Sequence, residues 1–330
     1  MSMLNKILLS FAAALSLAVT MSAQTLDLPA QNSPAPVPSA TLNFAVKGAD
    51  TLYLDIYRPA PGVCPECPDV RPDAARPTIL FMFGGGFKEG DRVAGTARWI
   101  NSLMAHGYTV VSIDYRLGMK DYKGAGLNMK FVRALINSIT IAVEDLYSAT
   151  LFLLENGAEY GVDARNMVVC GSSAGAISVL QGEYAICNGD ELAKVLPEGF
   201  NYAGVMSLSG AVYSNKGKPK YAVEPCPMAL FHGTDDSIVP YWKKGVLNYC
   251  LAGSSMIADA LSKKDYRYHI YRFKGRNHEV SIYQDYCLDL ELDFLENDVR
   301  LGNRRRVDAL IDDPLAPDPG WNLGDFKNLY

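Results

Sequence analysis

Short apolar runs alternate with helix-like segments along most of the chain. Residues 51–57, Thr-Leu-Tyr-Leu-Asp-Ile-Tyr, alternate apolar and polar positions, which predicts a half-buried strand. Later runs are predominantly apolar, which is the pattern of strands covered on both faces. These runs occupy residues 78–83, 108–113, 167–170, 204–208, 228–232 and 268–273.

Segments with helical character separate the apolar runs. They are predicted at residues 96–106, 139–156, from 174 onward, 240–252 and 280–297. Buried strands that alternate with helices form a parallel sheet with helices on both faces. The sequence therefore predicts an α/β fold with a mostly parallel central sheet, without an internal repeat.

The first 23 residues have a different pattern. Lys6 precedes an apolar run over residues 7–19, and small residues follow before polar Gln24. This pattern is typical of a signal peptide that is cleaved on export. A membrane anchor is the alternative, but the run is short for a span and a proline-rich segment follows. We expect residues 1–23 to be a signal peptide and the mature protein to be periplasmic or secreted.

The rest of the chain divides by composition. Residues 24–40 are rich in Pro, Ser and Ala, with too little apolar content to fold, and are expected to be a linker. Residues 41–300 carry the strand and helix pattern and form the predicted domain. Residues 301–330 begin with a basic run and continue with Pro, Asp and Gly, and we expect them to be a tail along the surface.

The charge balance excludes some classes of partner. The 330 residues include 31 Lys and Arg against 36 Asp and Glu, a formal net charge of −5. This mild acidic excess offers no electrostatic reason to expect nucleic acid or an anionic membrane surface. No apolar stretch after the first segment is long enough to span a bilayer, so stable membrane insertion is not expected.

The chain contains seven cysteines, and export would allow them to form disulfides. In an oxidising compartment some can pair, and the odd number leaves at least one free. Cys64 and Cys67 form a C-x-x-C in a proline-containing loop, without a helix start or a second ligand pair. A loop disulfide is therefore favoured there over a redox or zinc site. Cys170 lies in an apolar run and is expected to be a small buried hydrophobe.

The segment Gly171-Ser172-Ser173-Ala174-Gly175 follows the apolar run at 167–170. In a G-x-S-x-G turn between strand and helix, the glycines remove Cβ atoms that would clash, and the central serine is exposed in a strained conformation. The spacing makes Ser173 the candidate nucleophile and Ser172 a structural neighbour. An ordinary strand-to-helix turn is the alternative interpretation.

A second glycine segment, Gly84-Gly85-Gly86, ends the apolar run at 78–83. Consecutive glycines allow backbone N–H groups to approach a ligand closely. Together with the N–H of the residue after a nucleophile, two such groups can stabilise a tetrahedral oxyanion. A flexible turn is the alternative, and a phosphate loop is disfavoured because no Gly-Lys-Ser/Thr follows.

Candidate acids and bases follow the last two predicted strands. Asp235 and Asp236 come after the run at 228–232, and His278 follows the run at 268–273. Either aspartate could orient a histidine. His106 and His269 are expected to be structural and His232 to hold its own loop, which leaves His278 as the candidate base.

The order of nucleophile, acid and base resembles that of α/β-hydrolases of the carboxylesterase/lipase type, close to exported bacterial esterases. The resemblance spans about residues 50–298 and is most specific at residues 143–175 and in His-Gly-Thr-Asp-Asp-Ser-Ile-Val-Pro, residues 232–240. It implies an α/β-hydrolase fold with small cap insertions. Phe83 departs from many relatives, which have His there, and Ala176 stands where Gly is common.

The resemblance also implies roles for individual residues. Ser173 corresponds to the nucleophile, Asp236 to the acid, with Asp235 as the second choice, and His278 to the base. The N–H groups of three further residues correspond to the oxyanion donors: Gly85, Gly86 and Ala174. The segment 114–117 corresponds to a support of the oxyanion loop. Two-step acyl transfer through these groups requires no metal and no organic cofactor.

Three functions remain open at this point. The first is an exported serine esterase, the second a serine peptidase of the same fold, and the third a binding protein without activity. The sequence shows no broken motif of the kind that the third requires. Residues 117–138 and 183–225 are expected to build the substrate pocket. Six aromatic residues there could line it or simply pack: Tyr122, Phe131, Tyr184, Tyr202, Tyr213 and Tyr221.

Loop tyrosines are compatible with stacking on sugars. The sequence therefore suggests an acetyl or feruloyl ester of a carbohydrate as the substrate, with a lipid or another small ester as the alternative. No long apolar lid helix is found, which argues against a lipase that acts at an oil–water interface.

Overall fold

The computed structural model describes residues 34–60, 76–93, 96–124, 128–246 and 249–318. The expected signal peptide and the Cys64–Cys67 pair lie outside these residues. The remaining five cysteines are unpaired thiols, and Cys170 is fully buried, as its place in an apolar run predicted.

A nine-stranded sheet forms the centre of the fold, in the order β1-β2-β4-β3-β5-β6-β8-β11-β12. Its strands are β1 (Ala40–Lys47), β2 (Asp50–Tyr57), β3 (Thr78–Met82), β4 (Val110–Ile113), β5 (Met167–Ser172), β6 (Gly204–Leu208), β8 (Met228–Gly233), β11 (Tyr268–Phe273) and β12 (Arg306–Ile311). All neighbours are parallel except β1 with β2 and β2 with β4. The prediction of a mostly parallel α/β sheet is confirmed.

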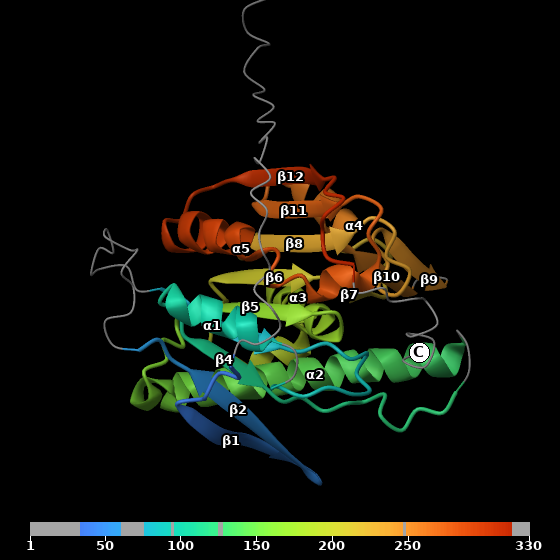
Figure 1. Ribbon diagram of the computed structural model, residues 1–330. Helices are drawn as coiled ribbons and strands as arrows, with labels where there is room; N and C mark the ends of the chain where they lie inside the picture. The colour runs from blue at the N-terminus through green and yellow to red at the C-terminus, as the bar shows by residue number, and fades with distance from the viewer. Residues whose placement is uncertain (1–33, 61–75, 94–95, 125–127, 247–248, 319–330) are drawn as a thin grey trace, which may run out of the picture. The chain divides into compact units, whose positions relative to one another are not determined.

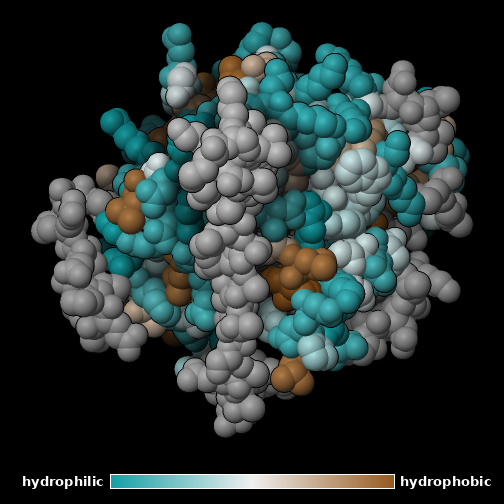
Figure 2. Space-filling model, turned by 90° about the horizontal axis from the view of Figure 1, so that it is seen from above, coloured by the Kyte–Doolittle hydropathy of each residue, from teal (hydrophilic) through white to brown (hydrophobic). Residues whose placement is uncertain are grey.

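Helices cover the sheet on both faces (Figure 1). They are α1 (Ala97–Ala105), α2 (Met129–Asn156), α3 (Ala174–Cys187), α4 (Ser254–Ser262) and α5 (Leu288–Phe294), with short helical turns η2 (Gly157–Tyr160), η3 (Glu191–Val195), η4 (His278–Ile282) and η5 (Leu295–Arg300). Within the described residues, none of these helices has the length and apolarity needed to cross a membrane. On the face in Figure 2, hydrophobic residues form only small areas among hydrophilic ones.

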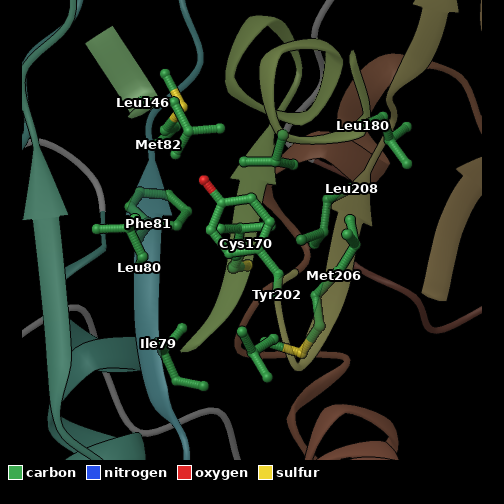
Figure 3. Packing of buried hydrophobic residues seen from close by; sticks show 14 of the residues in the cluster. Ile79, Leu80, Phe81, Met82, Leu146, Cys170, Leu180, Tyr202, Met206 and Leu208 are labelled. Atoms are coloured by element: carbon green, nitrogen blue, oxygen red, sulfur yellow. The ribbon is translucent and has the colours of Figure 1, made fainter. Parts of the chain in front are cut away.

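Successive residues of β3 show how both faces are filled. The Phe81 ring packs against Trp99 of α1, with ring centroids 5.0 Å apart. Met82, the next residue, lies beside Leu146 of α2 (Figure 3). Because neighbouring side chains of a strand point to opposite faces, α1 and α2 lie on opposite sides of the sheet. Every residue of β3 is buried, which explains its continuous apolar sequence.

The helix predicted at 139–156 begins ten residues earlier, at Met129. The Asn128 side chain caps it by accepting hydrogen bonds from the backbone N–H groups of Lys130 and Phe131 at 2.9 and 3.1 Å. The helix predicted at 280–297 is broken into η4, α5 and η5.

The helix predicted at 240–252 is wrong. Lys243–Val246 forms β9 and Tyr249–Gly253 forms β10, which pair with β7 (Ala211–Ser214) in a separate three-stranded antiparallel sheet. Gly253 ends β10 in a close backbone contact. A Cβ at this position would lie 1.6 Å from the carbonyl oxygen of Pro240, so only glycine fits there.

The prediction of a surface tail after residue 300 is wrong for Arg306–Ile311. This segment is β12, a parallel edge strand along β11. Asp308 accepts hydrogen bonds from Arg272 of β11 at 2.5 and 2.8 Å. The strand is exposed at every second position, so its sequence has no continuous apolar run. Because it also begins in a run of arginines, the sequence pattern gave only a weak indication of a strand. Strand β1, another edge strand, also escaped prediction.

Glu291 of α5 is a fully buried carboxyl group between α5 and α1. Its Oε2 accepts a hydrogen bond from Trp99 Nε1 at 2.6 Å, while Oε1 has no hydrogen-bond partner among the described residues. Burial raises its pKa to about 8, despite the opposing hydrogen bond from Trp99. The folded protein therefore holds this proton at pH values where the unfolded chain, with a Glu pKa of about 4.3, has lost it.

The free energy of unfolding is consequently expected to fall as the pH rises from about 4.3 to about 8, because the unfolded state binds fewer protons in that window. Glu291→Gln removes this titration and keeps an acceptor for Trp99. We expect the variant to be more stable than the parent at pH 8, with the difference shrinking toward pH 5. Urea denaturation at several pH values measures this, with the exposed Glu198→Gln as control. Parallel pH profiles of the parent and Glu291→Gln would contradict it.

Candidate active site

The turn between β5 and α3 holds Ser173 in a strained conformation. Its φ and ψ are 49° and −113°, a region that non-glycine residues rarely occupy. Glycine is required on both sides. A Cβ on Gly171 would lie 2.4 Å from the carbonyl carbon of Gly175, and one on Gly175 would lie 2.1 Å from the Met82 oxygen. The turn therefore closes against the end of β3, as the G-x-S-x-G spacing predicted.

Three predicted residues from separate loops meet in a chain of hydrogen bonds. Ser173 Oγ lies 2.8 Å from His278 Nε2, and His278 Nδ1 lies 2.8 Å from Asp236 Oδ2. All three side chains are buried. With its proton on Nδ1, His278 donates to Asp236 and accepts from the Ser173 hydroxyl, which is the arrangement that a general base needs.

Asp236 is held as an anion by its surroundings. Its Oδ1 accepts hydrogen bonds from the N–H groups of Ile238 and Val239 at 2.9 and 3.0 Å. Burial by itself raises the pKa of Asp236, but the charge of His278 and hydrogen bonds from His232 and His278 outweigh it and hold this pKa well below its ordinary value. The carboxylate therefore stays ionised at neutral pH.

His232 supports the acid from behind. Its Nε2 lies 3.3 Å from Asp236 Oδ2, and its Nδ1 lies 2.7 Å from Ser254 Oγ at the start of α4. This is the loop-holding position that the sequence predicted for His232. Asp235, the second choice for the acid, is exposed, and its Oδ1 accepts from the Thr234 hydroxyl at 2.9 Å. The structure thus brings Asp236, and not Asp235, to His278.

Two residues that join these loops were not assigned such contacts from the sequence. Asn277 Oδ1 accepts from the N–H groups of Ser237 and His278, both at 2.9 Å, and so connects the acid loop to the base loop. Ser172 Oγ donates to the Ser281 carbonyl at 2.6 Å and ties the end of β5 to η4. The position of Asn277 beside His278 was the only signal in the sequence.

The glycine loop after β3 lies against the nucleophile turn. A Cβ on Gly84 would lie 3.3 Å from the Ser173 Cβ, which shows how closely the two turns approach. Gly85 and Gly86 have φ values of 114° and 62°, where glycine is favoured. Ala174 is the first residue of α3, where helical N–H groups lack an intrahelical partner. The roles of Gly85, Gly86 and Ala174 as oxyanion donors stay a prediction.

The segment 114–117 supports this loop from the side. The Tyr115 hydroxyl donates to the Phe83 carbonyl at 2.9 Å, and the two rings stack with centroids 4.4 Å apart. Arg116 in turn is held by the buried Asp145 of α2, whose Oδ2 accepts from the Arg116 N–H at 2.8 Å. An aromatic residue at position 83, where many relatives have His, is therefore part of the packing around the loop.

The aromatic residues expected near the pocket have different environments. Phe131, Tyr202 and Tyr221 are buried in the core, which agrees with the packing alternative. Tyr122 and Tyr184 are half-buried and pack against the same core. Tyr213 is half-buried on β7 and stacks on Tyr249.

A cluster of possible metal ligands lies away from these loops. Within the described residues, His269, Asp293 and Asp298 place ligand atoms within 4.8 Å of one another. Arg305 Nη2 donates to Asp293 Oδ2 at 2.7 Å, and its Nε donates to Asp298 Oδ2 at 3.0 Å. His269 Nε2 lies 3.1 Å from Asp298 Oδ1. The protein thus supplies its own cation to these carboxylates, and His269 has the structural role expected of it.

Comparisons with known proteins find similarity to esterases and lipases. Residues 66–185 match the family model BD-FAE. Esterase LipI of Mycobacterium tuberculosis is 30% identical over 150 residues, which make up 45% of this chain and 39% of that protein. Lipase 2 of Geotrichum candidum is 30% identical over 133 residues, or 39% of this chain and 21% of that protein. The chain thus spans less than half the length of these curated relatives.

Solved structures extend the likeness over most of the chain. The apo form of Thermogutta terrifontis esterase 2 has a TM-score of 0.56 and 21% identity, over 80% of this chain and 96% of that one. Its propionate-bound form also has a TM-score of 0.56, over 81% of this chain and 97% of that one. The chain has the α/β-hydrolase fold, and the matched part of its sequence is similar to esterases and lipases.

The two neighbouring aspartates allow a matched test of the site. Asp236→Asn removes the charge that orients His278 and keeps the size of the side chain. We expect it to slow the labelling of Ser173 by a fluorophosphonate probe by about 10³-fold or more. Asp235→Asn should label at the rate of the parent, because the Asp235 carboxylate contacts Thr234 and not His278. Equal slowing in both variants, or in neither, would reject the role of Asp236.

Proposed function

We propose that this protein is an exported serine carboxylic-ester hydrolase in which Ser173, His278 and Asp236 form the catalytic triad. The observation that carries the proposal is the continuous, buried chain of hydrogen bonds from Ser173 Oγ through His278 to Asp236. Its place at the ends of three strands of an α/β-hydrolase sheet supports the proposal. Export rests on the signal-peptide pattern of residues 1–23.

The geometry suits two-step acyl transfer. As Ser173 Oγ attacks the ester carbonyl carbon, its proton passes to His278 Nε2, and the carbonyl oxygen becomes an oxyanion. The N–H groups of Gly85, Gly86 and Ala174 would stabilise that charge. Asp236 stabilises the imidazolium, which then gives the proton to the leaving alcohol. Water attacks the acyl-enzyme by the same route and releases the acid, so the enzyme returns to its starting state without a metal or an organic cofactor.

We propose esters with short acyl groups, carried by a carbohydrate, as the substrates. Structures of the Thermogutta terrifontis neighbour have been solved with propionate and with butyrate bound, which supports a short acyl group. The carbohydrate side is supported by the stacked pair of half-buried Tyr213 and exposed Tyr249.

Hydrolysis of p-nitrophenyl esters of increasing chain length tests the proposal. We expect activity on acetyl and butyryl esters that falls for long chains. Ser173→Ala should lower kcat by about 10⁴-fold or more, because no other group at the turn can form the acyl-enzyme. The matched control is Ser172→Ala, which loses one hydrogen bond to Ser281 and should keep kcat within about tenfold.

The same assay separates the main alternative. A peptidase would cleave peptidyl p-nitroanilides with a kcat/KM above that for the esters, and Ser173→Ala would abolish that activity. No turnover of either substrate class by the folded protein would reject a hydrolase function.

A further inference from the structure

The small sheet of β7, β9 and β10 has an unusual charge. Its described residues and those of its adjoining loops, 211–220, 240–246 and 249–253, contain no Asp or Glu in a chain of net charge −5. They contain five exposed lysines: Lys216, Lys218, Lys220, Lys243 and Lys244. We call these residues the basic sheet. Their formal charge is opposite in sign to the net charge of the protein.

One face of the basic sheet carries aromatic rings beside lysine. Tyr213 of β7 pairs with Leu251 of β10, which pairs with Lys244 of β9. Directly paired residues share a face, and so does Tyr249, two residues before Leu251. The rings of Tyr213 and Tyr249 are stacked, with centroids 6.3 Å apart and an interplanar angle of 19°. None of these four side chains is buried, whereas the other face packs on the domain through Val212.

A third aromatic residue lies at the edge of the basic sheet. Trp242 is 42% exposed, and Lys218 Nζ lies 5.5 Å from the centre of its ring. Lys218 also pairs with Asp259 of α4 at 3.1 Å, and Asp259 is paired with Lys263 as well. The nearby carboxylate is therefore shared by two lysines and does not reverse the positive charge of this region.

The basic sheet is attached to the triad at both ends. On one side, the Ser173 N–H donates to the Leu208 carbonyl at 2.9 Å, three residues before β7 begins. On the other, β10 runs directly into Ser254, which contacts His232 at 2.7 Å, and His232 contacts Asp236. Figure 1 shows β7, β9 and β10 on the side where β5, β6 and β8 end. The basic sheet is thus joined directly to the segments that hold Ser173 and Asp236.

We propose that the basic sheet binds the sugar chain of an acidic polysaccharide, one that bears uronate carboxylates, while its ester group reacts at Ser173. This inference rests on the proposed function and names its substrate class. The exposed rings of Tyr249 and Trp242, with half-buried Tyr213 stacked on Tyr249, offer flat surfaces for pyranose rings. The lysines lie on strands and loops that contain no acidic residues. They attract the uronate carboxylates and so orient the polymer on this sheet, although the protein as a whole has a net negative charge.

An acidic glycan suits this face better than an anionic membrane does. The face carries a stacked pair of tyrosine rings, and a ring surface of this kind can pack against the flat face of a sugar. A membrane-binding surface would instead need apolar side chains that enter the lipid. The exposed residues of the basic sheet are mainly lysine, tyrosine and a tryptophan next to lysine.

The test compares three substrates: acetylated glucuronoxylan, the same polymer after reduction of its uronate carboxyls, and p-nitrophenyl acetate. Lys243→Gln/Lys244→Gln removes both charges of β9, of which Lys244 shares the face of Tyr213 and Tyr249 and Lys243 pairs with Ala252 on the other face. We expect this variant to raise KM for the acidic polymer about five- to tenfold at low salt. Its KM for the reduced polymer and for p-nitrophenyl acetate should equal that of the parent. The difference should shrink as the salt concentration rises to 0.3 M. Lys194→Gln, which removes an exposed lysine of η3, is the matched control.

Tyr249→Ala tests the aromatic part. It should raise KM for both polymers, charged and neutral, with no change for p-nitrophenyl acetate. Its control is Tyr53→Ala, because Tyr53 of β2 is 40% exposed and Tyr249 is 37% exposed. The proposal would be overturned if the wild-type protein had the same KM for the acidic and the reduced polymer and if neither value changed with salt.

A binding measurement separates this inference from the proposed function. The Ser173→Ala variant should still migrate more slowly in affinity electrophoresis when the gel contains deacetylated glucuronoxylan. Adding Lys243→Gln/Lys244→Gln should abolish most of that slowing. Binding without hydrolysis of any ester would reject the proposed function and keep the basic sheet as a glycan site. Absence of glycan binding, or binding only to phosphatidylglycerol vesicles, would reject the inference even if the protein hydrolyses esters.

Discussion

The close contact of the Ser173 turn with the end of β3 is the constraint on which the site depends. Gly175 lies so near the Met82 carbonyl that any side chain would collide with it, and Gly84 approaches Ser173 itself. This contact requires glycine on both turns and places the nucleophile beside the loop of candidate oxyanion donors. The strained φ of Ser173 is tolerated because every residue of β5 and most residues of α3 are buried and hold the turn in place.

The acid and base loops reach Ser173 from strands β8 and β11, and polar side chains hold them in register. Asn277 connects the two loops, and His232 joins the acid loop to the start of α4. Buried groups of this kind are stable only when their hydrogen bonds are made. Asp236 meets this condition with two backbone N–H groups and two histidines, and it can therefore remain charged inside the protein.

The hydrogen bond of His232 to Ser254 also places the acid next to the small sheet. Strand β10 ends at Gly253, immediately before that serine, and β7 follows the strand whose carbonyl holds the Ser173 N–H. One scaffold thus positions both the reacting groups and a face with exposed rings and lysines. The large sheet carries the reacting groups, whereas the small sheet adds residues whose formal charge is opposite to that of the whole chain.

Local sequence determined the buried parallel strands, the glycine turns and the order of Ser173, Asp236 and His278, because burial and sharp turns restrict residue type position by position. It did not determine β10 or β12, which pair with strands far away in the chain, or β9, which pairs with β10 alone. Two adjacent aspartates look alike in sequence, and only the fold buries one against His278 and exposes the other. Contacts of Asn277 and Ser254 likewise form between distant segments, so the tertiary structure alone decided them.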